Sequence, residues 1–164
     1  MADWARLSDE ELARRGRDLV RRRQYALGQE ILAEYCSRQV AQGRPIGASV
    51  MCAYGLAIGM TGDLHEGLET CQRALSVDRR NAEIWAAVGR LAMHAGIRKK
   101  AVEAVARGLS LAPRNRDLLE LRDVLGERRR PIVPFLARSN AVNVHLGRAL
   151  HRLRKGSKGG AKPA

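Results

Sequence analysis

Aromatic residues are scarce in this 164-residue chain. They make up 4% of it, as two Trp, three Tyr and one Phe, whereas 45% of the residues are hydrophobic. A core therefore has to be built mainly from Leu, Val, Ile, Met and Ala. Only five prolines interrupt a sequence rich in Ala, Leu, Arg and Glu, which favour helix over strand. This composition excludes a β-rich fold, and the length suits one ordinary domain.

Cysteine is also rare. Cys36, Cys52 and Cys71 form no C-x-x-C pair, and an odd number of cysteines in apolar stretches cannot build a disulfide framework. We expect them to be reduced thiols in the core. The acidic segment from Met1 to Glu11 has no apolar stretch of the kind found in signal or transit peptides. Together these features predict a cytoplasmic protein.

Patterns for catalysis and metal binding are missing. None of the four histidines is paired with another at the i, i+4 spacing that brings two metal ligands together on a helix. The glycines of residues 55–62 are not followed by Lys-Ser or Lys-Thr, so they make no phosphate-binding loop. No set of acid, base and nucleophile is in view. We therefore expect no enzymatic activity, no metal site and no cofactor.

Long apolar runs are missing too. Residues 45–62 form an uncharged stretch that only just reaches the minimum length of a membrane span. The stretch contains four Gly, three Ala, one Ser, one Thr and one Pro, so its transfer into a bilayer gains little free energy. A buried helix is the better interpretation.

Charge is unevenly distributed. The chain has 30 basic and 17 acidic residues, a net charge of +13, but the segment 128–164, here called the C-terminal arm, has ten basic residues and no acidic one. Residues 1–127 therefore carry a net charge of only +3. The arm is either a binding element for nucleic acid, a ribosome or an anionic membrane, or simply a solubilising tail. Its cations up to residue 155 include Arg128, Arg129, Arg130, Arg148, Arg152, Arg154 and Lys155.

The middle of the chain contains an internal repeat. Residues 48–81 match residues 82–115 without a gap at ten positions, among them Gly55 with Gly89 and Gly62 with Gly96. The second copy has Trp85, Gly89, Ala92, Ala101 and Pro113 at spacings that resemble the tetratricopeptide repeat (TPR), a helical hairpin. In the first copy the Trp and Pro positions hold other residues.

A third, less regular unit covers residues 9–42. A capping box of Ser8 and Glu11 marks its start, and Asn115 is positioned to cap a helix over 116–126. The resemblance thus implies an all-α fold. It predicts a short TPR-type solenoid of about three repeats, 9–42, 48–81 and 82–115, with a capping helix at 116–126, all in a domain of residues 1–127.

The C-terminal arm differs in pattern from the repeats. Two prolines favour an extended strip over residues 128–135, and the apolar residues Val142, Leu146, Leu150 and Leu153 share one stripe of a basic amphipathic helix that ends near residue 155. This helix either packs on the repeats or faces an anionic surface. We expect the Gly- and Lys-rich residues 156–164 to be disordered.

In a TPR stack the first helix of each repeat lines a concave groove. The resemblance therefore implies a groove with an apolar, Met-containing centre and basic margins, which suits an apolar segment of another protein. The protein's own termini or a second copy of the chain could fill it instead. Asparagines are missing from the expected groove face, which argues against the carboxylate clamp of chaperone-binding TPR domains. The groove residues expected are Arg17, Val20, Arg21, Cys52, Leu56, Met60, Ala86, Arg90, Met93 and His94.

Two functions are consistent with these features. The first is a non-enzymatic adaptor or chaperone-like scaffold that binds a protein segment in the groove. Bacterial three-repeat proteins that look after secreted substrates resemble this chain in length, although they are usually acidic. The alternative is a protein that attaches by charge to nucleic acid, a ribosome or an anionic membrane through the C-terminal arm.

Overall fold

The computed structural model describes residues 4–126. They belong to the first of two units into which the chain divides, residues 1–126 and 127–164. The extended strip, the basic amphipathic helix and the disordered tail expected in the C-terminal arm lie outside the described residues.

Residues 4–126 are helical, and no strand occurs among them. The predicted all-α repeat fold is therefore confirmed for this part of the chain. The elements are η1 (Trp4–Arg6), α1 (Asp9–Arg21), α2 (Tyr25–Ala41), α3 (Ala48–Thr61), α4 (Leu64–Val77), α5 (Ala82–His94), α6 (Arg98–Leu111) and α7 (Arg116–Leu125).

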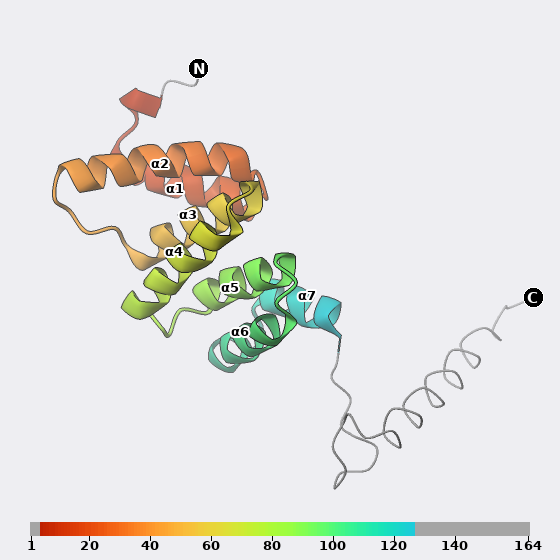
Figure 1. Cartoon of the computed structure of the whole chain (residues 1–164). Helices are drawn as coiled ribbons and strands as arrows, with labels where there is room; N and C mark the ends of the chain where they lie inside the picture. The colour runs from red at the N-terminus through yellow and green to blue at the C-terminus, as the bar shows by residue number, and fades with distance from the viewer. Residues whose placement is uncertain (1–3, 127–164) are drawn as a thin grey trace, which may run out of the picture. The chain divides into compact units, whose positions relative to one another are not determined.

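The helices are arranged as consecutive hairpins. Helices α1 and α2, α3 and α4, and α5 and α6 pack against each other as pairs, and each pair contacts the next through α2 with α3 and α4 with α5 (Figure 1). The first helices of the pairs also contact one another in order, α1 with α3, α3 with α5 and α5 with α7. Helix α7 thus takes the place of the first helix of a fourth pair and covers the end of the stack.

The helix starts follow local sequence signals. The Glu11 amide donates to Ser8 Oγ (3.3 Å) and the Ser8 amide donates to Glu11 Oε2 (3.1 Å), which completes the expected capping box. The Leu118 amide donates to Asn115 Oδ1 (3.1 Å) at the start of α7. At the start of α4, Asp63 Oδ1 accepts from the Glu66 amide (2.9 Å) and caps that helix as well.

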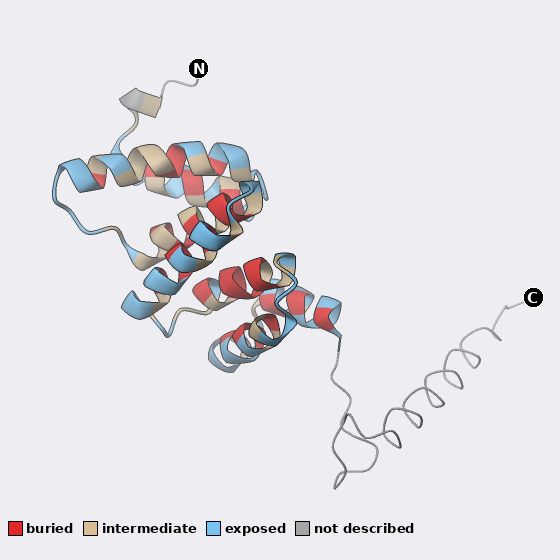
Figure 2. Cartoon of the chain, in the orientation of Figure 1, coloured by how far each residue is buried: buried red, intermediate tan, exposed pale blue. Residues whose placement is uncertain are grey.

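The core is aliphatic, as the composition predicts. The largest fully buried side chains include Leu12, Leu32, Ile84, Leu91 and Leu118. Buried positions, red in Figure 2, occur in every helix from α1 to α7. All three cysteines are free thiols. Within the described residues, no helix combines the length and the hydropathy that crossing a bilayer requires.

A polar cluster secures the beginning of the stack. The Arg38 guanidinium on α2 donates to the carbonyl of Leu7 (2.7 Å) and to that of Trp4 (3.2 Å), which holds η1 against α2. Asp9 accepts hydrogen bonds from Gln39 Nε2 (3.0 Å) and from the Arg44 guanidinium. The first turn of α1 is thereby tied to the connection between α2 and α3.

Candidate functional site

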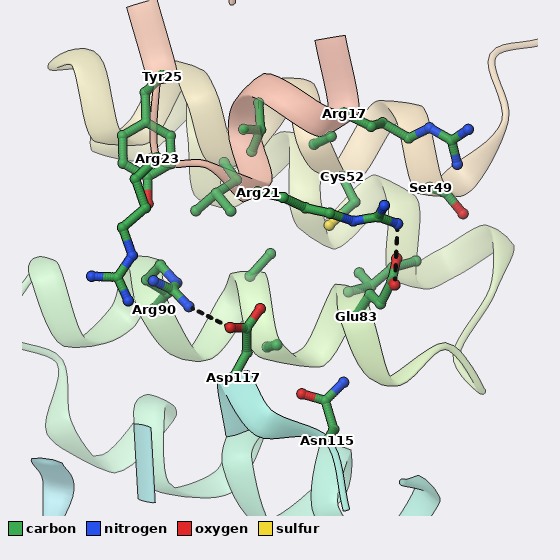
Figure 3. Close-up of a pocket in the computed structure, with 16 residues that line it drawn as sticks. Arg17, Arg21, Arg23, Tyr25, Ser49, Cys52, Glu83, Arg90, Asn115 and Asp117 are labelled. Atoms are coloured by element: carbon green, nitrogen blue, oxygen red, sulfur yellow. Dashed lines mark ion pairs between the residues drawn. The ribbon is translucent and has the colours of Figure 1, made fainter. Parts of the chain in front are cut away.

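A cavity of about 150 Å³ lies where the first helices of the pairs meet. Helices α1, α3, α5 and α7 all contribute to its lining, together with Arg23 in the turn between α1 and α2 and Tyr25 at the start of α2 (Figure 3). The lining residues are Arg17, Val20, Arg21, Arg23, Tyr25, Ser49, Cys52, Ala53, Leu56, Glu83, Ile84, Ala86, Ala87, Arg90, Asn115 and Asp117.

The floor of the cavity is apolar and consists mostly of small side chains. Val20, Cys52 and Ala86 are each only 5% exposed, and Ile84 is fully buried beneath them. Leu56 is half-buried and packs against two of the core clusters. Since small residues leave room above a hydrophobic floor, the cavity can accept an apolar side chain from outside.

The rim of the cavity is charged. The Arg21 guanidinium on α1 pairs with Glu83 on α5 (3.5 Å), and the Arg90 guanidinium on α5 pairs with Asp117 on α7 (3.5 Å). Figure 3 shows Arg17 and Arg21 on the side of Glu83, while Arg23 and Arg90 lie toward Asp117. Cations therefore flank the apolar floor at both ends of the cavity.

A further ion pair lies beside the cavity. The Arg23 guanidinium, in the turn after α1, pairs with Glu120 on α7 (3.4 Å). Together with the pair of Arg21 and Glu83, it connects the first hairpin to the third hairpin and to α7. Both pairs join side chains that are 45–63% exposed, so each adds at most about 1 kcal/mol of stability.

The thiol in the cavity stays protonated. The contact with the Cys71 side chain and burial raise the pKa of the Cys52 thiol well above its ordinary value of 9.0. The thiolate is the nucleophilic form of cysteine, so Cys52 acts in the cavity as a small hydrophobic group. Among residues 4–126, no group of three or more His, Cys, Asp or Glu side chains is placed to hold a metal ion.

The structure brings together most, but not all, of the residues expected in the groove. Arg17, Val20, Arg21, Cys52, Leu56, Ala86 and Arg90 line the cavity.

Met60, Met93 and His94 do not line the cavity, so the Met-containing centre expected from the sequence is absent from it. Met60 packs against one core cluster and Met93 against another, while His94 is exposed at the end of α5. The reason is a close contact between α3 and α5. Leu91 covers Gly59 so tightly that a Cβ there would lie 2.4 Å from Leu91 Cδ2, and this contact closes the cavity before the last turn of α3.

Other lining residues were missed by sequence reasoning. Arg23 comes from the turn after α1, Tyr25 is the first residue of α2, and Asn115 and Asp117 come from the start of α7. A helical periodicity assigns faces only within a helix, so it carries no signal for residues in turns. The signal available for Asn115 and Asp117 was the position of α7, which starts one full repeat after α5.

The comparisons with solved structures agree with the hairpin arrangement. An Arabidopsis OM64 TPR domain is similar to this chain with a TM-score of 0.57 and 17% identity, covering 71% of this chain and 93% of that domain. The C-terminal TPR-containing domain of a Plasmodium falciparum protein described as FK506-binding has a TM-score of 0.52 and 13% identity, covering 75% and 93%.

A third similar structure is the Hsp90 co-chaperone Cns1 from Saccharomyces cerevisiae, with a TM-score of 0.57 and 12% identity. The match covers 92% of this chain but only 44% of the Cns1 chain. Neither a family model nor a curated protein sequence matches. At these identities the likeness concerns the fold, and the described residues have the TPR fold.

Proposed function

We propose that this protein is a non-enzymatic adaptor or chaperone-like scaffold that binds a segment of another protein in the cavity formed by α1, α3, α5 and α7. The observation that carries the proposal is the combination of an apolar floor with room above it and a lining supplied by all three hairpins and α7. A segment bound there contacts side chains from every part of the stack. Its affinity therefore depends on the relative positions of the hairpins as well as on single residues.

Leu56 is the most informative position for a test. It is half-buried, lines the cavity and lies on the central first helix α3. A carboxylate at this position would have to be desolvated by any apolar group that entered the cavity. We expect Leu56→Asp to abolish capture of a partner in a pull-down, with helical circular dichroism unchanged.

A matched control separates the cavity from general surface effects. Val77, at the end of α4, is 66% exposed and does not line the cavity, so Val77→Asp makes the same chemical change elsewhere. Ala53→Trp is a second cavity variant, which fills the space without adding charge. We expect the wild type and Val77→Asp to capture the partner equally. If Leu56→Asp and Ala53→Trp both capture it to the same extent, the cavity is not the binding site.

The charge of the C-terminal arm favours a second candidate function, attachment to nucleic acid, a ribosome or an anionic membrane. Ten cations without an acid over residues 128–164 support this proposal. Binding to RNA, DNA and anionic vesicles should then weaken steeply with salt and should be lost when residues 128–164 are removed. Binding that does not change with salt concentration and persists without residues 128–164 contradicts this second proposal.

A further inference from the structure

The arginines around the cavity indicate what kind of segment it takes. Four arginines line the cavity, Arg17, Arg21, Arg23 and Arg90, against two carboxylates, those of Glu83 and Asp117. The excess of positive charge lies directly beside an apolar floor. Building on the proposed function, we propose that the cavity binds an internal segment of another protein in which acidic side chains flank a single aliphatic side chain.

The size of the cavity limits the apolar part of such a segment. Its volume of about 150 Å³ is comparable to that of a protein cavity that accommodates one benzene molecule. One Leu, Ile, Val or Met side chain therefore fills it. Arginines stand at both ends of this space, so acidic residues on either side of the aliphatic one would each meet a guanidinium (Figure 3).

The existing ion pairs show how a bound carboxylate would be accommodated. Arg21 is paired with Glu83 at 3.5 Å and Arg23 with Glu120 at 3.4 Å, and the side chains of both arginines are at least 60% exposed. Exposed pairs of this kind are weak, so a carboxylate of the partner can replace Glu83 or Glu120 at little cost. The protein's own acids thus occupy the positions that the partner's acids would take.

Charge also favours another protein over the chain's own C-terminal arm as the occupant of the cavity. The arm has ten cations and no acid, so entering a cavity with an excess of arginines would bring like charges together. A phosphate backbone matches the arginines but supplies no aliphatic side chain for the floor. An acidic and aliphatic protein segment satisfies both parts of the site.

The test is a selection from a library of short random peptides displayed on phage, with each peptide joined to the coat protein at its C-terminus so that no free terminal carboxylate is offered. The targets are the full-length wild type and the Leu56→Asp variant. We expect the wild type to enrich peptides with Asp or Glu on both sides of a single aliphatic residue, and Leu56→Asp to enrich none of them.

Affinities of one enriched peptide, synthesised with capped ends, then test the arginines. The double variant Arg21→Gln with Arg23→Gln should bind it about tenfold more weakly. Glu83→Gln should bind it about two- to fivefold more tightly, because Arg21 loses its partner on α5 and keeps only its exposed pair with Asp18 (3.4 Å). The control is Arg14→Gln with Arg15→Gln. It removes two exposed arginines of α1 that do not line the cavity, and should leave the affinity within about twofold.

The outcomes separate this inference from the proposed function. Enriched peptides that are uncharged or basic, but still depend on Leu56, overturn the acidic specificity and leave groove binding intact. Weaker binding of the peptide by Glu83→Gln also overturns the acidic specificity and leaves groove binding intact. If the selection yields no peptide that Leu56→Asp loses, both proposals fail. The remaining outcome is that the wild type binds a single-stranded RNA oligonucleotide, the Arg21 and Arg23 double variant loses that binding, and no acidic peptide is enriched. That result assigns the arginines to phosphate binding and overturns the inference.

Discussion

Replacing Gly67 with alanine tests the close backbone crossing of α3 and α4. When the two matching repeats are aligned, Gly67 corresponds to Ala101, and alanine is favoured over glycine inside a helix by about 1 kcal/mol. Comparison of the repeats alone therefore predicts a harmless or stabilising change. In the structure, however, a Cβ at position 67 would lie 2.6 Å from the carbonyl oxygen of Gly55 and 2.6 Å from both N and Cα of Gly59.

The magnitude follows from the atoms involved. Ordinary contacts of a Cβ begin near 3.4 Å, and all three atoms met here belong to the backbone of α3, so no side-chain rotation relieves the overlap. Helices α3 and α4 have to move apart, which loosens the packing around Cys52 and Cys71. Overpacking costs about 1–3 kcal/mol, and since no side chain can move to relieve this overlap the cost here lies in the upper part of that range, about 2–3 kcal/mol. The helix propensity of alanine returns about 1 kcal/mol. We expect Gly67→Ala to destabilise the protein by about 1–2 kcal/mol.

The assay is urea unfolding followed by far-ultraviolet circular dichroism, together with a thermal melt. A loss of this size lowers the Tm by roughly 3–8 °C for a protein of this length. The control is Gly89→Ala, where the nearest atom to a Cβ is Val105 Cγ2 at 3.3 Å, so a small side-chain movement is sufficient. We expect that variant to stay within about 0.5 kcal/mol of the wild type. A Gly67→Ala protein as stable as the wild type would refute the close backbone contact.

Two further predictions concern the ends of helices. Gly47 is the N-cap residue of α3, with φ −63° and ψ 142°, and no atom lies within 4 Å of the place a Cβ would take. A serine there can cap the helix with its hydroxyl, so Gly47→Ser should raise the free energy of unfolding by about a few tenths of a kcal/mol. A lower urea midpoint contradicts this prediction. Partial burial acts to raise the pKa of Asp9, but hydrogen bonds from Gln39 and Arg44 outweigh it and lower that pKa below its ordinary value of 3.8. The stability that this carboxylate supplies is therefore present above about pH 4 and lost as the pH falls through the lowered pKa. Asp9→Asn should be less stable than the wild type at pH 7 and lose less stability between about pH 5 and pH 3; an unchanged acid dependence would show that Asp9 contributes nothing.

The sequence by itself determined the helices and where most of them begin. The match of residues 48–81 to residues 82–115, the capping box of Ser8 and Glu11 and the cap at Asn115 can all be found without a structure. The caps and the helical periodicity depend on residues within a few positions of one another along the chain, because helix formation and capping are governed by neighbouring backbone groups. For this reason they could be interpreted without knowing how the helices pack.

Only the tertiary structure decided which side chains reach the cavity. Met60 and Met93 occupy helical positions that suit a groove, yet neither lines the cavity. Both are partly buried and pack against core clusters, and α5 lies directly on α3 at Gly59. Arg23 and Asp117 reach the cavity from a turn and from α7, whose distances from α3 are not encoded in any periodicity. The sector of a helix that faces inward depends on the rotation and separation of its neighbours, and these are set by contacts such as Gly67 on Gly55.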